Sequence, residues 1–174
     1  MDRAKKVVVI GDVFADMISK VQGFPETGGR TFGTSFMRNS GGTGVNIAAG
    51  LAVLGMEASI VCGLGDDENG EFLLEELKQS GVNTEHVKVT AGLKSGAVPI
   101  MVDEDGERVI YVLVKGSAFE AIEPEDLLFL EEMNPDALCF TGVIIGAHPV
   151  EESAILAARR WKGRAKLYFD PNLC

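Results

Sequence analysis

The chain has 174 residues, of which 46% are hydrophobic and 24% are charged, and its formal net charge is −10 at pH 7. This composition is typical of a globular protein that buries a single core, and it excludes an intrinsically disordered or a disulfide-rich chain. The acidic balance also excludes a surface that binds the phosphates of nucleic acids, because such surfaces cluster Lys and Arg.

The sequence contains no segment typical of a membrane span, a signal peptide or a metal site. No apolar run approaches the ~20 residues that cross a bilayer, and "MDRAKKVVVIGD" leads into an acidic turn instead of a cleavage site. We therefore expect a cytoplasmic protein. Cys62, Cys139 and Cys174 are far apart, and His86 and His148 are the only histidines. This spacing favours small buried thiols over a zinc site, a disulfide framework or a catalytic Cys–His pair.

Predicted strands and helices alternate along the chain. The β-branched run Lys5–Asp12 is typical of a strand covered on both faces, and the stretch "SGGTGVNIAAGLAVLG" predicts a glycine loop that leads into a helix. The order indicates a doubly wound, Rossmann-like α/β fold with a mainly parallel sheet. The predicted elements are a helix over 43–54, a strand over 58–63, a helix over 69–82, a short strand over 85–89, a helix over 124–133, a strand over 136–142, a helix over 149–163 and a strand over 165–172.

One segment interrupts this alternation. Residues 95–117 contain two extended runs joined by Asp103-Glu104-Asp105-Gly106, and the Asp-Gly pair is a hairpin signal. Apolar residues such as Ile100, Met101 and Tyr111 would need a partner or a ligand if the hairpin projects from the domain. The segment is therefore expected to be a projecting flap or, as the alternative, an extension of the main sheet.

The glycine loop is a candidate binding element. Gly41, Gly42 and Gly44 allow a positive φ and a close approach to the main chain. The first turn of the following helix has unpaired N–H groups that suit ligand oxygens, although a glycine-rich turn that binds nothing is the alternative. The common nucleotide fingerprints are absent, because Glu68 occupies the third glycine position after Gly63 and Gly65, and no Lys-Ser or Lys-Thr follows the glycine loop.

Polar side chains also occur where predicted strands end. Asp12 follows the first strand and is interpreted as an acceptor for the N–H groups of a turn or as part of the edge of an active site. Asp16 lies in the apolar context "VFADMI", where a carboxylate is costly unless it is exposed or receives donors such as sugar hydroxyls. Asp170 and Asn172 lie at the carboxyl end of the last predicted strand, at the edge where α/β sheets bind their ligands.

Together these motifs resemble the ribokinase-like (PfkB) family of carbohydrate kinases. The resemblance covers almost every residue from about Lys5 onward, and it corresponds to the N-terminal portion of that family's fold. The segments "VVVIGDVFADMI", "NSGGTGVNIAAGLAVLG", "CGLGDDENGEFL", "GAVPIMVDEDGERVIY", "GSA" and "DPN" occur in the order seen in the family. The ordered set is more specific than any one of its members.

The resemblance implies a substrate site. Asp16 matches the aspartate that accepts hydrogen bonds from substrate hydroxyls, and Gly41, Gly42 and Asn46 match the glycines and asparagine that hold the sugar from the other side. Val98 and Ile100 would belong to the hairpin that acts as a lid and that sometimes pairs two subunits into a homodimer. The implied cofactors are ATP and Mg²⁺, and no metal ligand is assigned within this chain.

The family's Gly-Ala-Gly-Asp-like segment, which carries the catalytic base and the anion hole, is absent and is expected beyond Cys174. The hypothesis is therefore an incomplete ATP-dependent kinase that phosphorylates a primary hydroxyl of a sugar or nucleoside, with 1–174 forming one ribokinase-like domain inactive by itself. The alternative is a non-catalytic sugar-binding domain. A nicotinamide-dependent oxidoreductase is disfavoured by the absent fingerprint.

Overall fold

The computed structural model describes residues 5–172, and its centre is a four-stranded parallel sheet in the order β10-β9-β1-β4. The three strands β9, β1 and β4 consist largely of apolar residues that are nearly all buried, as expected for strands covered on both faces. The strands are β1 (Lys6–Ile10), β4 (Glu57–Val61), β9 (Ala137–Thr141) and β10 (Lys166–Asp170).

Helices cover both faces of this sheet. Successive residues of β1 point to opposite faces, so Val7 and Val9 pack with one set of helices while Val8 and Ile10 pack with the other. The first face carries α1 (Thr43–Val53) and α2 (Glu68–Gln79), and the second carries α4 (Val150–Trp161), α3 (Leu130–Met133) and the 3₁₀ turns η1 (Ala118–Glu120), η2 (Pro124–Leu127) and η3 (Gly142–Ile144). The predicted doubly wound α/β fold is confirmed.

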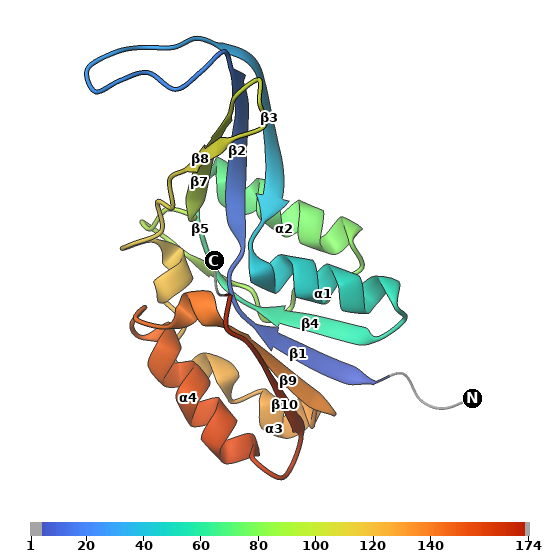
Figure 1. The fold of residues 1–174 in the computed structure, drawn as a ribbon. Coiled ribbons are helices and arrows are strands. Elements are labelled where there is room, and N and C mark those ends of the chain that lie inside the picture. Colours follow the sequence, from blue (N-terminus) through green and yellow to red (C-terminus); the bar gives the residue numbers. More distant parts are fainter. Residues whose placement is uncertain (1–4, 173–174) are drawn as a thin grey trace.

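A second four-stranded sheet, here called the projecting sheet, extends away from this domain (Figure 1). Its order is β3-β2-β7-β8, with β2–β7 parallel and the other two pairs antiparallel. The predicted hairpin is present as β7 and β8, but it pairs with β2, so it neither stands alone nor extends the main sheet. The strands are β2 (Phe14–Val21), β3 (Gly33–Gly41), β7 (Ala97–Val102) and β8 (Arg108–Ile110).

Two smaller features complete the fold. The short strand expected over 85–89 corresponds to β6 (Lys88–Thr90), which pairs in parallel with β5 (Gly63–Gly65). The single helix expected over 124–133 is wrong, because η2 and α3 occupy that segment as separate turns. The backbone hydrogen bonds of this segment are largely of the 3₁₀ type, from the N–H groups of Asp126, Leu128 and Glu131 to the carbonyls three residues earlier, so no continuous α-helix forms.

The cysteines and the last strand also bear on the predictions. Cys62 and Cys139 are buried free thiols, as expected, and Cys174 lies outside the described residues. Strand β10 is exposed along its whole length, with Tyr168 and Phe169 53% and 55% exposed. Apolar hollows flank β10 on both faces of the sheet. Within residues 5–172 no helix is long and apolar enough to cross a bilayer.

Candidate substrate site

The side chain of Asp12 connects the start of α1 with the end of β1 through hydrogen bonds. Its side chain is 1% exposed, and the carboxylate accepts hydrogen bonds from the backbone N–H of Thr43 (2.7 Å), the backbone N–H of Gly44 (3.3 Å) and Oγ1 of Thr141 (2.7 Å). Its backbone carbonyl also accepts the N–H of Val45 (3.2 Å). Asp12 is therefore an acceptor for a turn, the first of the two interpretations, and it connects the ends of β1 and β9 with α1.

This arrangement uses the N–H groups at the start of α1. Gly42 occupies the N-cap position and supplies no side-chain cap. The carboxylate of Asp12 takes that role from another strand. Because the N–H groups of Thr43, Gly44 and Val45 all donate to Asp12, they are not available to a ligand. The expectation that ligand oxygens bind the first-turn N–H groups is wrong for these three residues.

The glycines allow this close contact. Gly42 has a φ of 107°, a conformation that side chains disfavour. A Cβ atom on Gly44 would lie 2.6 Å from the carbonyl oxygen of Asp12, and a Cβ atom on Gly41 would overlap the carboxylate of Asp16. The missing side chains therefore bring the loop against both aspartates.

Asp16 lies on β2 of the projecting sheet. Its carboxyl group interacts electrostatically with Asp12, so the two carboxylates lie near each other at the carboxyl edge of the first strand, as the sequence suggested. The neighbours of Asp16 across the sheet are Asn39 on β3 and Val98 on β7. The side chain is half-buried, and no group within residues 5–172 donates a hydrogen bond to its carboxylate. Burial raises the pKa of the Asp16 carboxyl, and the negative charge of Asp12 raises it further. Asp16 is thus an acceptor that hydrogen-bond donors of a ligand would satisfy.

The other predicted residues of the projecting sheet have different surroundings. Ile18 and Ile100 pair across β2 and β7 two positions beyond Asp16 and Val98, so these side chains share one face of the sheet. Val98 is buried in the cluster that contains Phe14, and Ile100 is partly buried against the same cluster. Val98 is therefore the buried part of this face, while Ile100 is its partly exposed part.

Asn39 is a candidate that the sequence analysis missed. It is exposed on β3, directly opposite Asp16 in the antiparallel register, and therefore on the same face of the projecting sheet. Only the register between β2 and β3 could have revealed Asn39, and this register could not be derived because β3 was not predicted.

Asn46 and the end of β10 complete the candidate set. Asn46 is exposed on the first turn of α1, where its backbone N–H donates to the carbonyl of Gly42 (3.3 Å). Asp170 pairs with Thr141 across β9, and the N–H of Asn172 donates to the Asp170 carboxylate (2.9 Å). Asp170 therefore lies one strand away from the Thr141–Asp12 contact, at the carboxyl edge of the main sheet. Within residues 5–172 no three His, Cys, Asp or Glu side chains are grouped to hold a metal ion.

A doubly wound sheet with a glycine loop at its carboxyl edge and a projecting β-sheet is the architecture of ribokinase-like sugar kinases. The uncharacterised sugar kinase PH1459 from Pyrococcus horikoshii has a similar structure, with a TM-score of 0.79 and 25% sequence identity. That match covers 97% of this chain and 53% of the other. The chain belongs to the pfkB family of carbohydrate kinases, whose model matches residues 4–174. The resemblance found in the sequence is confirmed.

Two relatives show how much of a whole kinase sequence this chain covers. The chain is 33% identical over 126 residues to the ribokinase of Mus musculus, which covers 72% of this chain and 38% of the relative. It is 32% identical over 167 residues to the ATP-dependent ribose-1-phosphate kinase of Halopiger xanaduensis, which covers 96% of this chain and 54% of the relative. The chain thus spans about half the length, or less, of the curated relatives that it matches.

Proposed function

We propose that this chain forms the substrate-binding part of a kinase that transfers the γ-phosphoryl group of ATP to a primary hydroxyl of a sugar or nucleoside. The observation that carries the proposal is the half-buried Asp16 carboxylate, which lies against Gly41 and receives no hydrogen bond within residues 5–172. A polyhydroxylated substrate supplies such donors. The names of the relatives, which include ribokinase, fructokinase and aminoimidazole riboside kinase, support this substrate class.

The proposed roles follow from the positions of the residues. Asp16 accepts hydrogen bonds from substrate hydroxyls, and the exposed amide of Asn46 binds the substrate from the α1 side. Gly41 and Gly42 leave space for the substrate beside the main chain. Val98 and Ile100 belong to the part of the projecting sheet that excludes water when the substrate is bound, which protects phosphoryl transfer from hydrolysis.

ATP with Mg²⁺ is the proposed phosphoryl donor. PH1459, 24% identical to this chain, has also been solved in complex with ATP, and the Halopiger relative is named as ATP-dependent. The Asp170 carboxylate and the Asn172 amide are oxygen donors of the type that Mg²⁺ accepts; Asp170 ends β10 and Asn172 lies two residues beyond it, at the carboxyl edge of the main sheet. When bound, Mg²⁺ would neutralise charge on the phosphates. The catalytic base and most of the ATP site are assigned to the part of the relatives that this chain does not span.

A homodimer through the projecting sheet is part of the same proposal. Phe36 and Met37 on β3 are 68% and 48% exposed, and Tyr111 beyond β8 is 55% exposed. Exposed apolar residues on strands at the edge of a sheet favour pairing with a second copy. Light scattering of the complete gene product should show a dimer that Phe36→Asp together with Tyr111→Asp converts to a monomer. A monomeric unmodified protein would refute this part.

The kinase assignment is tested by measuring ADP release from the complete gene product and from a polypeptide limited to residues 1–174. Pentoses, hexoses, keto-sugar acids and nucleosides form the substrate panel. We expect sugar-dependent turnover from the complete product, none from residues 1–174, and a large loss in Asp16→Ala. Turnover by residues 1–174 would show that the catalytic base was wrongly assigned to the part of the relatives that this chain does not span.

The second candidate is a sugar-binding domain without catalysis, which rests on the same Asp16 carboxylate, because an acceptor for substrate hydroxyls supports binding whether or not a phosphoryl group is transferred. Calorimetry distinguishes it, because this candidate predicts sugar binding that depends on Asp16 without ADP release from either polypeptide. No binding of any member of the panel would refute both functions.

A further inference from the structure

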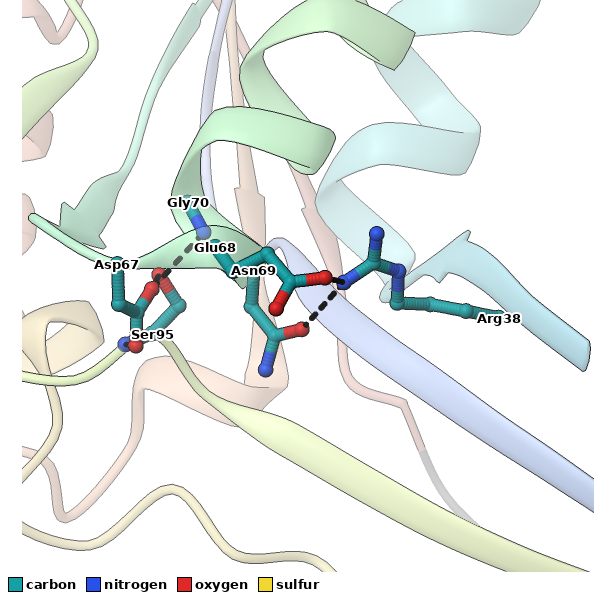
Figure 2. A network of polar contacts seen from close by, with 6 residues as sticks. All are labelled: Arg38, Asp67, Glu68, Asn69, Gly70 and Ser95. Atoms are coloured by element: carbon teal, nitrogen blue, oxygen red, sulfur yellow. Dashed lines mark hydrogen bonds and ion pairs between the residues drawn. The ribbon is translucent and has the colours of Figure 1, made fainter.

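The first turn of α2 contacts the β3 edge of the projecting sheet through Arg38. Nη1 of Arg38 lies 3.2 Å from Oε1 of Glu68 and 3.2 Å from Oδ1 of Asn69. The guanidinium also lies 4.3 Å from the centre of the Phe72 ring. Figure 2 shows Arg38 extending from its strand to the two polar side chains. One cation thus connects the projecting sheet to α2 in three ways.

The same turn of α2 holds the segment that leads into β7. Asp67 caps α2 by accepting the N–H of Gly70 (2.9 Å), and its carboxylate also accepts the N–H (3.1 Å) and the hydroxyl (2.8 Å) of Ser95 (Figure 2). The hydroxyl oxygen of Ser95 in turn accepts the N–H of Gly65 (2.9 Å). Ser95 is 5% exposed. The Ser95 end of this connection is buried, and the Asp67 carboxylate accepts three hydrogen bonds, so the connection is a firm anchor.

The Arg38 connection is of a different kind. The side chain of Glu68 is 86% exposed and that of Arg38 is 28% exposed, so the ion pair is largely solvated and weak. Beside it lies an open hollow lined by Met17, Phe36, Lys94 and the Arg38 contacts themselves. The Arg38 contact is therefore weaker and more exposed than the Ser95 anchor.

The strand alternation links this contact to the substrate site. Arg38 pairs with Met17, and Asn39 pairs with Asp16, so the two successive residues of β3 point to opposite faces of the projecting sheet. Gly41, at the end of the same strand, lies against the Asp16 carboxylate. The Arg38 contacts with α2 therefore hold the segment of β3 that faces Asp16 on its other side.

We propose that Arg38 is a positioning residue, which holds the β3 edge of the projecting sheet on α2 in the arrangement that places Asn39 and Gly41 beside Asp16. The inference rests on the proposed sugar kinase function. It predicts an effect on the sugar substrate alone, because Arg38 contacts no residue assigned to the nucleotide.

The test compares Arg38 variants of the complete gene product in steady-state kinetics and sugar-binding calorimetry. Arg38→Met should raise the KM and Kd for the sugar roughly three- to tenfold, while kcat, the KM for ATP and the Tm stay near their unmodified values. Arg38→Lys should restore part of the affinity, because it keeps the charge near Glu68 but loses the planar guanidinium over Phe72. Arg159→Met, an equal change on the exposed side of α4, is the matched control and should change nothing.

Two results would overturn the inference. One is an unchanged sugar KM and Kd in Arg38→Met. The other is a parallel rise in both KM values with a lower Tm, which would assign Arg38 a structural role only. Failure of the proposed function is distinguishable, because the unmodified protein would then neither release ADP nor bind any sugar.

Discussion

Replacing Asp12 with Ala should cost the protein a large part of its stability. The change removes the acceptor for two backbone N–H groups of α1 and for the hydroxyl of Thr141, at a position that is 1% exposed. Each buried donor left without a partner costs about 1–3 kcal/mol, and such losses add incompletely. We therefore expect Asp12→Ala to lower the free energy of unfolding by about 3–5 kcal/mol, from a typical total of about 5–15 kcal/mol.

Urea unfolding of the complete gene product, followed by circular dichroism, measures this loss. Thr141→Val is the graded control, because it removes one donor and keeps the side-chain shape, so its cost should be about 1 kcal/mol. Asp12→Asn should fall between the two, since its amide nitrogen faces donors. The reasoning would be refuted by an Asp12→Ala protein that loses less than about 1 kcal/mol with an unchanged m-value.

Three further predictions concern the substrate site. Asp16→Ala and Asn46→Ala should each cost roughly 1.5–3 kcal/mol in kcat/KM for the sugar with little change in the KM for ATP, and unchanged sugar kinetics in both would contradict the site. Because the pKa of Asp16 is raised in the folded protein, its ionisation lowers stability as pH rises through the acid range, whereas sugar donors favour the ionised form. Calorimetry should therefore show sugar affinity rising as the pH increases above the ordinary carboxyl range of about 4, and Asp16→Asn should abolish that rise. Gly44→Ala should lower the free energy of unfolding in urea by more than about 2 kcal/mol, because the new Cβ would meet the Asp12 backbone. Gly50→Ala is the control in the same helix, and it should stabilise the protein by about 0.5–1 kcal/mol because the space around Gly50 is open. Equal effects of the two substitutions would contradict the packing argument.

The main domain could be predicted because its elements carry strong local signals. The buried runs of β1, β4 and β9 are continuous and apolar, and α2 combines Leu73 and Leu77 on its buried side with Gly81 in a left-handed conformation after its end. In these elements burial on a defined face produces the periodicity that sequence analysis detects.

The projecting sheet could be predicted only in part, because its strands carry weak local signals. Strand β3 is exposed along most of its length, so its side chains follow no apolar alternation, and β2 carries Asp16 where a core residue would stand. The sequence therefore located Asp16 only as near the carboxyl edge of the first strand, and Asn39 was missed. Resemblance to the kinase family made Asp16 a candidate site residue without knowledge of the strand that carries it.

The contact between Asp12 and Thr141 has a consequence for biosynthesis. The two residues are 129 positions apart in the chain. At ~5–20 residues per second, a ribosome needs on the order of ten seconds to extend the chain from the first of them to the second. During that interval the nascent glycine loop lacks the hydroxyl that completes the hydrogen bonds of Asp12. The candidate substrate site is thus expected to form only after β9 has left the ribosomal tunnel and docked beside β1.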